Sequence, residues 1–166
     1  MFTKTSLKNL SYTRHPVNIN DVICFIRNQF STLCKKLEIE MNIVVTVGKL
    51  EKDYTVLATN DGNSIRFFVS HIKELVALFE TNSARKAWIN CLIAHELFHS
   101  IAPFKRDEFK TEFEYEDYIN NKTVDWVNHN LSDGMNSIKR EYHRWGKYDK
   151  SGIWYTLSFG MEKEWR

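Results

Sequence analysis

Apolar residues recur at helical spacing in several stretches of the chain. This pattern predicts four helices, over residues 21–38, 72–79, 84–101 and 112–131. Asn20-Asp21 is a good N-cap pair at the start of the first helix, and Pro103 forces the end of the third. The fourth helix has the weakest periodicity, and Ser132-Asp133-Gly134 ends it.

Shorter runs rich in β-branched and aromatic residues lie between the first two helices. They predict three strands, over residues 43–47, 54–58 and 65–70. The step Asp61-Gly62 favours the positive φ of a hairpin turn, so we expect an antiparallel meander. In the tail, residues 153–159 predict a further strand, while residues 138–147 are either helical or irregular. Helices packed on one face of a short sheet give an α+β fold.

Length and composition limit the class of protein. The 166 residues suit one domain, and a hydrophobic content of 43% with six Gly and two Pro allows a sizeable core. No apolar run is long enough to span a membrane, so we expect no membrane partner. We interpret Cys24, Cys34 and Cys91, which form no CxxC pair, as reduced core thiols of a cytoplasmic protein.

The third predicted helix contains the sequence His95-Glu96-Leu97-Phe98-His99. Residues four apart on a helix share one face, so both imidazoles can bind one metal ion. Glu96 lies about 100° around the helix from His95, where it can activate a water on the open side of the metal. Two imidazoles with an open position suit Zn²⁺, and Glu96 is the expected general base.

This HExxH helix, preceded by a helix and three strands, resembles the minimal zincin metallopeptidases, in particular the ImmA/IrrE-like and SprT-like families. The resemblance covers about residues 18–131 of a single domain 1–166, which leaves 132–166 as a C-terminal extension. It implies a zinc-dependent endopeptidase that cleaves a specific protein. It also implies that residues 65–70 form the sheet edge along which an extended peptide docks.

The third metal ligand is expected on the helix after the HExxH helix. In ImmA/IrrE-like proteins a Glu occupies this place, three residues before an Ala-Asn or Ala-Asp pair. Val124-Asp125 resembles that pair, which puts Asn121, a poor zinc ligand, in the Glu position. The stretch around Asp125 also resembles the ligand helix of lethal-factor-like zincins. We therefore favour Asp125, and the alternatives are, in order, Asp117 or Glu116, and then His129.

Two further features of the sequence bear on function. Zincins often add a downstream side chain that stabilises the oxyanion, and the candidates here are Tyr115, Tyr118, Tyr142, His143, Arg144 and Tyr155. Cations interleaved with aromatic residues in the tail are the basis for a possible nucleic-acid contact through residues 139–150, although a solvated face explains them better: Lys139, Arg140, Arg144, Lys147 and Lys150.

The sequence thus predicts a zinc endopeptidase in which His95, His99 and Asp125 bind the metal and Glu96 deprotonates the attacking water. The alternative is a regulator on a zincin scaffold that binds a protein or nucleic acid and has no catalytic activity. Asn121 at the expected Glu position is the feature that favours this alternative.

Overall fold

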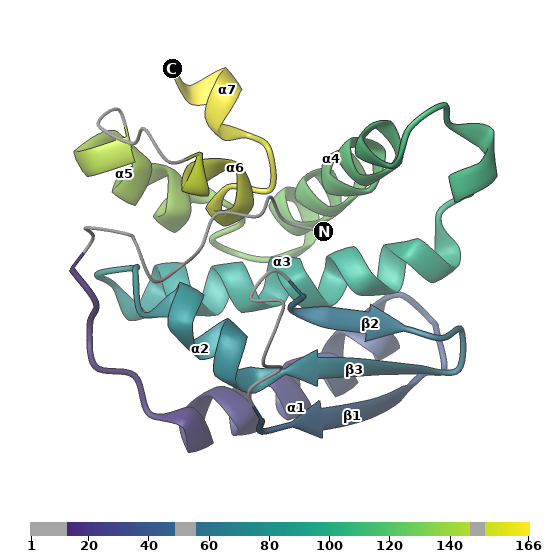
Figure 1. Cartoon of the computed structure of the whole chain (residues 1–166), viewed down its shortest axis with the longest axis horizontal. Helices are drawn as coiled ribbons and strands as arrows, with labels where there is room; N and C mark the ends of the chain where they lie inside the picture. Colours follow the sequence, from purple (N-terminus) through teal and green to yellow (C-terminus); the bar gives the residue numbers. More distant parts are fainter. Residues whose placement is uncertain (1–12, 49–55, 147–151) are drawn as a thin grey trace.

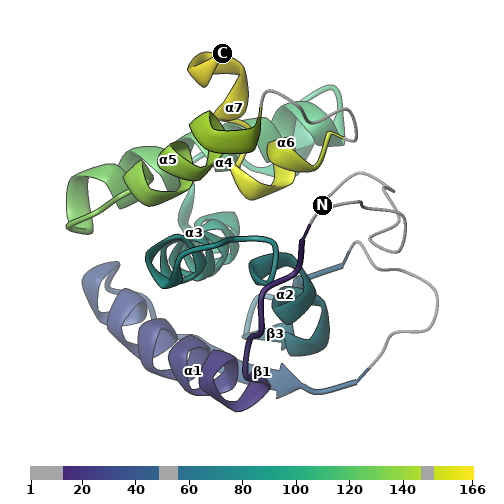
Figure 2. The same cartoon turned by 90° about the vertical axis from the view of Figure 1, so that its left-hand side faces the viewer.

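Helix α3 (Asn82–Ile101) lies in the middle of the computed structural model, between two layers of the chain (Figures 1 and 2). The structure describes residues 13–48, 56–146 and 152–166. One layer holds the first helix, the sheet and α2, and the other holds the helices that follow α3. The chain is therefore α+β, as the sequence predicts.

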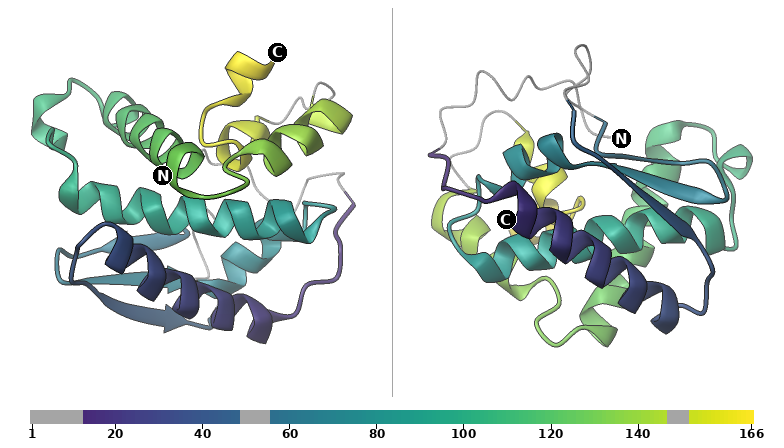
Figure 3. Two further views of the ribbon diagram at one scale, coloured as in Figure 1. Left: turned by 180° about the vertical axis from the view of Figure 1, so that it is seen from behind. Right: turned by 90° about the horizontal axis from the view of Figure 1, so that it is seen from below.

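Helix α1 (Ile19–Lys36) covers the sheet from behind and packs on α3 (Figure 3). Its N-cap is Asn18, two residues before the predicted cap Asn20, and the Asn18 side chain accepts hydrogen bonds from the backbone N–H groups of Asn20 and Asp21. The buried stripe of α1 has the predicted helical spacing: Val22, Ile26, Phe30 and Leu33.

The sheet contains β1 (Asn42–Thr46), β2 (Ala58–Asn60) and β3 (Ser64–Phe68) in the order β1-β3-β2. β2 and β3 are antiparallel, which confirms the predicted hairpin, but β1 is parallel to β3, so the prediction of an all-antiparallel meander is wrong. The apolar pattern cannot decide this direction, because the parallel register also places Ile43 beside Ile65 and Val45 beside Phe67.

The β2–β3 turn has the predicted chemistry. The carboxylate of Asp61 accepts hydrogen bonds from the backbone N–H groups of Asn63 and Ser64, at 2.9 and 2.7 Å. Gly62 has a φ of +92°, which L-residues with a side chain rarely adopt. Of the strand expected over residues 54–58, residues 54 and 55 lie outside the described part of the chain, and β2 begins only at Ala58.

Helix α2 (Val69–Val76) follows β3 directly, and α4 (Glu112–Asn130) follows α3 after a connection that includes the 3₁₀ turn η2 (Arg106–Glu108). Thr81 caps the start of α3 by accepting from the N–H of Ala84 at 3.2 Å. Its end is set by Ala102, which adopts extended backbone before Pro103, as predicted.

The C-terminal part of the chain forms α5 (Asn136–Trp145), α6 (Ile153–Leu157) and α7 (Glu162–Trp165). The strand predicted over residues 153–159 is therefore wrong. As a helix, residues 153–157 bury the side chains of Trp154 and Leu157. The described sheet contains only β1, β3 and β2, so no described strand pairs with this segment. No helix of the described residues is both long and apolar enough to cross a bilayer.

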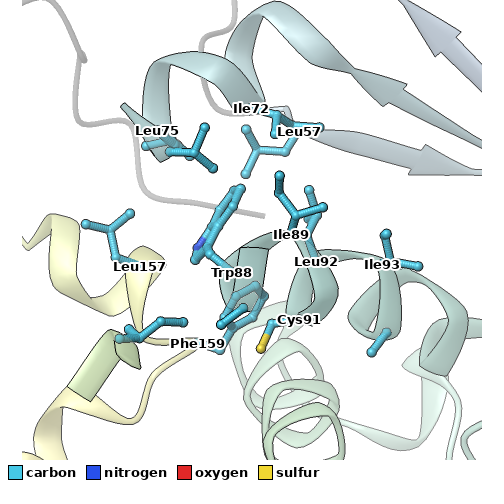
Figure 4. Packing of buried hydrophobic residues seen from close by; sticks show 14 of the residues in the cluster. Leu57, Ile72, Leu75, Trp88, Ile89, Cys91, Leu92, Ile93, Leu157 and Phe159 are labelled. Atoms are coloured by element: carbon cyan, nitrogen blue, oxygen red, sulfur yellow. The ribbon is translucent and has the colours of Figure 1, made fainter. Parts of the chain in front are cut away.

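The main hydrophobic cluster joins both layers through α3 (Figure 4). Trp88 and Leu92 of α3 pack in the same cluster as Leu57 and Ile72 of the sheet layer and Phe159 of the C-terminal layer. The indole N–H of Trp88 also donates to the carbonyl of Thr156 at 3.3 Å. The extension after α4 is thus part of the same core.

Candidate metal centre

The two histidines of the HExxH segment face each other across one turn of α3. Their Nε2 atoms are 3.1 Å apart, and the centroids of the rings are separated by 4.7 Å. The side chain of His95 is 3% exposed and that of His99 is 18% exposed. Helical spacing therefore brings the predicted pair of imidazoles together at the edge of the core.

Helix α4 brings a carboxylate to this pair. Glu116 places Oε2 at 3.0 Å from Nε2 of His95 and Oε1 at 3.5 Å from Nε2 of His99. Burial by itself raises the pKa of Glu116, but the hydrogen bonds with His95 and then His99 outweigh it and hold the pKa below its usual range. Glu116 is therefore ionised at neutral pH.

These three donors fit a zinc ion. In a tetrahedral site with bonds of about 2.0–2.1 Å, neighbouring donor atoms are about 3.3 Å apart. The separations observed among His95, His99 and Glu116 are 3.1, 3.0 and 3.5 Å. Two imidazoles and one carboxylate are also a usual ligand set of catalytic zinc, in which one position stays open.

Glu96, the predicted general base, lies beside this set. One of its carboxylate oxygens is within 4.8 Å of a ring nitrogen of each histidine, but Glu96 forms no ion pair with His95 or His99, whereas Glu116 pairs with both. Of the two carboxylates, Glu116 is therefore the one placed to complete a metal site with His95 and His99, and Glu96 lies beside them.

The side chain of Tyr115 contacts the second ring nitrogen of His99, Nδ1. The hydroxyl of Tyr115 lies 3.0 Å from Nδ1 of His99. Burial, followed by the charges of Glu116 and Glu96, raises the pKa of Tyr115, so its hydroxyl stays protonated at neutral pH. Nδ1 of His95 has no hydrogen-bond partner among the described residues, and this ring packs against Phe159 with centroids 6.0 Å apart.

The site opens into a cleft of about 660 Å³ between β2, α3 and the beginning of α4. Glu96, His99 and Glu116 line it, and one wall is formed by residues 56–60. Lys105 is the only lysine or arginine among the described residues that line the cleft, and its Nζ donates to the carbonyl of Ser100 at 3.0 Å.

The wall of the cleft is an edge strand. Among the strands of the described residues, β2 pairs only with β3, and both the carbonyl of Leu57 and the N–H of Asp61 bond to that side. Because backbone groups alternate along a strand, those of Ala58 and Asn60 point away from β3. The predicted docking edge at residues 65–70 is wrong, since β3 is the central strand and Ser70 belongs to α2.

Asn60 fixes this strand to α3. Its Nδ2 donates to the carbonyl of Glu96 at 3.1 Å and to Oγ of Ser100 at 2.9 Å. The side chain therefore joins the wall of the cleft directly to the helix that carries the two histidines.

The structure does not bring Asp125 to the imidazoles; of the alternatives named for the third ligand, Glu116 is the one that it brings there. Asp125 is exposed, and the helical rotation of about 100° per residue places it roughly 180° around α4 from Glu116. His129 is also exposed, and its Nδ1 lies 2.6 Å from the carbonyl of Asp125. Asp117 instead lies 3.5 Å from Nζ of Lys163 in α7.

None of the six side chains proposed for the oxyanion lines the cleft: Tyr115, Tyr118, Tyr142, His143, Arg144 and Tyr155. Tyr115 bonds to the far side of the His99 ring, and Arg144 lies 2.6 Å from Glu80. Phe113 stacks on the ring of Tyr155, and burial followed by the charge of Asp117 raises the pKa of that tyrosine to about 12.

Two other features of the sequence are placed away from the cleft. Cys91 is fully buried, and its Sγ lies 3.2 Å from Sδ of Met135, so it packs in the core as expected. In the basic tail, Arg140 and Arg144 pair with Asp133 and Glu80, while Lys147 and Lys150 lie outside the described residues.

Comparison with known proteins adds no relative: no family model, no curated protein and no solved structure matches the chain.

Proposed function

We propose that this protein is a zinc-dependent endopeptidase on a minimal zincin-like fold. One observation carries the proposal: His95, His99 and Glu116 present three zinc-type donors within 3.0 to 3.5 Å of one another in a cleft that Glu96 also lines. The free thiols Cys24, Cys34 and Cys91 fit a cytoplasmic location, which we propose as well.

Zinc supplies two things when it is bound: it lowers the pKa of water to about 7 and polarises the carbonyl under attack. The carboxylate of Glu96 takes a proton from the attacking water, whose oxygen forms a bond to the carbonyl carbon of the substrate. The carbon–nitrogen bond then breaks, and Glu96 passes the proton to the leaving amine.

The edge strand supports a protein or peptide as the substrate. The outward backbone groups of Ala58 and Asn60 can pair with an extended peptide, which adds to the sheet as a further strand along the cleft. Asn60 positions this strand against α3 through Glu96 and Ser100. The scissile bond would thereby be placed beside Glu96.

The alternative of a noncatalytic binding module loses its main argument. It was favoured by Asn121, a poor ligand at the position where a Glu was expected. The side chain of Asn121 donates to the carbonyl of Asp117, and Glu116 supplies a carboxylate to both histidines. The donor set therefore does not depend on Asn121.

The test compares wild type, Glu96→Gln and Glu112→Gln, an exposed glutamate of α4 that serves as the matched control. Bound zinc is measured by mass spectrometry of the metal, and cleavage is measured on a library of peptides from digested cell protein. We expect one zinc per chain in all three proteins. We also expect a loss of cleavage of about 10²- to 10⁴-fold in Glu96→Gln alone. Equal cleavage by wild type and Glu96→Gln, or no zinc in wild type, would contradict the proposal.

A further inference from the structure

We propose that Tyr115 is a positioning residue that fixes the ring of His99 and accepts its Nδ1–H when Nε2 binds the metal. This inference rests on the metal site of the proposed function and adds a residue that does not itself touch the metal.

The two nitrogens of His99 have different surroundings. Nε2 faces Nε2 of His95 and the carboxylate of Glu116, whereas Nδ1 faces the hydroxyl of Tyr115. A neutral imidazole carries its single proton on one of the two nitrogens. When Nδ1–H donates to the phenol oxygen, the lone pair on Nε2 is available to a metal. Without a metal, Nε2–H can donate to the carboxylate of Glu116, and a bound metal takes the place of this proton.

The helix explains why one element contacts both sides of the ring. Tyr115 and Glu116 are consecutive in α4, so their side chains diverge by about 100°. One residue reaches Nε2 of His99 and the other reaches Nδ1. The orientation of the imidazole is thereby fixed by a single turn of α4.

Packing holds Tyr115 in this place. Its ring lies 5.5 Å from that of Phe109, and it belongs to a small buried cluster with Ala102 and Ile119. His99 is more exposed than His95. The ring of His95 packs on Phe159, whereas the ring of His99 packs on Tyr115 itself, with centroids 5.2 Å apart. Tyr115 therefore restrains the ring of His99, as packing on Phe159 restrains the ring of His95.

The experiment compares wild type with Tyr115→Phe, which removes only the hydroxyl, and with Tyr118→Phe. Tyr118 is the matched control, because it is a neighbouring tyrosine of α4 that packs on Phe104 and Phe109 and does not line the cleft. Zinc affinity is measured by titration against a chelator of known affinity. Outer-shell partners of metal ligands contribute about 10- to 100-fold, so we expect that loss of affinity in Tyr115→Phe and less than about twofold in Tyr118→Phe.

A second measurement locates the proton of His99 directly. Nitrogen-15 NMR of the zinc-loaded wild type should show the proton of His99 on Nδ1, in slow exchange with solvent. In Tyr115→Phe this proton should exchange faster, which a purely structural defect would not produce while zinc is still bound.

The outcomes separate the two proposals. Equal zinc affinity in wild type and Tyr115→Phe, or an unprotonated Nδ1 of His99 in the wild-type complex, would overturn the role of Tyr115 alone. Zinc bound with the expected difference but no peptide cleavage would overturn the peptidase and keep the inference. A wild type that binds no zinc would overturn both.

Discussion

Glu116 and Asp125 lie on opposite faces of helix α4, although either carboxylate is a plausible ligand in the sequence. Glu116 lies 3.0 Å from His95, whereas Asp125 is exposed. We expect Glu116→Gln to weaken zinc binding by more than about 100-fold, because loss of a ligand exceeds the effect of an outer-shell partner. Asp125→Asn should leave the affinity unchanged.

The same chelator titration measures both variants, and His95→Ala serves as the reference for a lost ligand. A result in which Asp125→Asn loses zinc and Glu116→Gln retains it would reverse our assignment of the third ligand.

Asn60 should contribute to stability and to the position of the cleft wall. Its side chain donates two hydrogen bonds to α3, and their loss should lower the free energy of unfolding by about 1–3 kcal/mol in Asn60→Ala. Urea denaturation measures this effect. Thr59→Ala, an exposed change on the same strand, is the control and should cost less. Equal costs would mean that the bonds to Glu96 and Ser100 do not stabilise the fold.

Glu141 should be the most costly glutamate to replace with glutamine. It is fully buried, and its carboxylate accepts from the backbone N–H groups of Glu80 and Thr81 and from the Thr81 hydroxyl, at 2.6, 3.2 and 3.0 Å. We expect Glu141→Gln to lower the free energy of unfolding by about 1.5–3 kcal/mol.

Glu80→Gln is the matched control for that measurement. The side chains of Glu80 and its partner Arg144 are about half exposed, so breaking this ion pair should cost at most about 1 kcal/mol. If both variants unfold at the same urea concentration, the buried carboxylate does not anchor the beginning of α3.

The three cysteines should react with iodoacetamide in the order of their exposure. Cys24 is exposed, burial raises the pKa of Cys34, and burial raises the pKa of Cys91 far above its usual value. At neutral pH we expect rapid modification of Cys24, slower modification of Cys34, and modification of Cys91 only after unfolding. Peptide mass spectrometry measures each rate, and fast labelling of native Cys91 would contradict its buried position.

Sequence patterns predicted helices α1 to α4 because each has buried apolar residues at helical spacing. The HExxH pair was equally predictable, since its geometry depends on one helix only. Which carboxylate of α4 lies beside the two histidines depends on how α4 packs against α3. The weak apolar periodicity of α4 does not specify this packing. One signal was available: the short connection after Pro103 returns the chain to His99, so the first turns of α4, which include Glu116, are the nearest.

The two errors in the β structure have a related cause. Residues 153–159 combine β-branched and aromatic residues, but burial against α3 decides their conformation, and Ile153, Trp154 and Leu157 are buried as parts of a helix. The order of strands β1, β3 and β2 likewise depends on tertiary contacts, since each strand keeps its inner apolar residues in either direction.

The segment between α6 and α7 packs behind the candidate metal centre. Phe159 touches the ring of His95, a centroid distance of 6.0 Å, and packs equally close to Trp88. A shortened protein that stops after Leu131 would keep every proposed donor and the general base, yet it would admit water to the rear of an imidazole whose Nδ1 has no described partner. Removal of residues 132–166 would therefore loosen the ring of His95, because the packing contact with Phe159 would be lost.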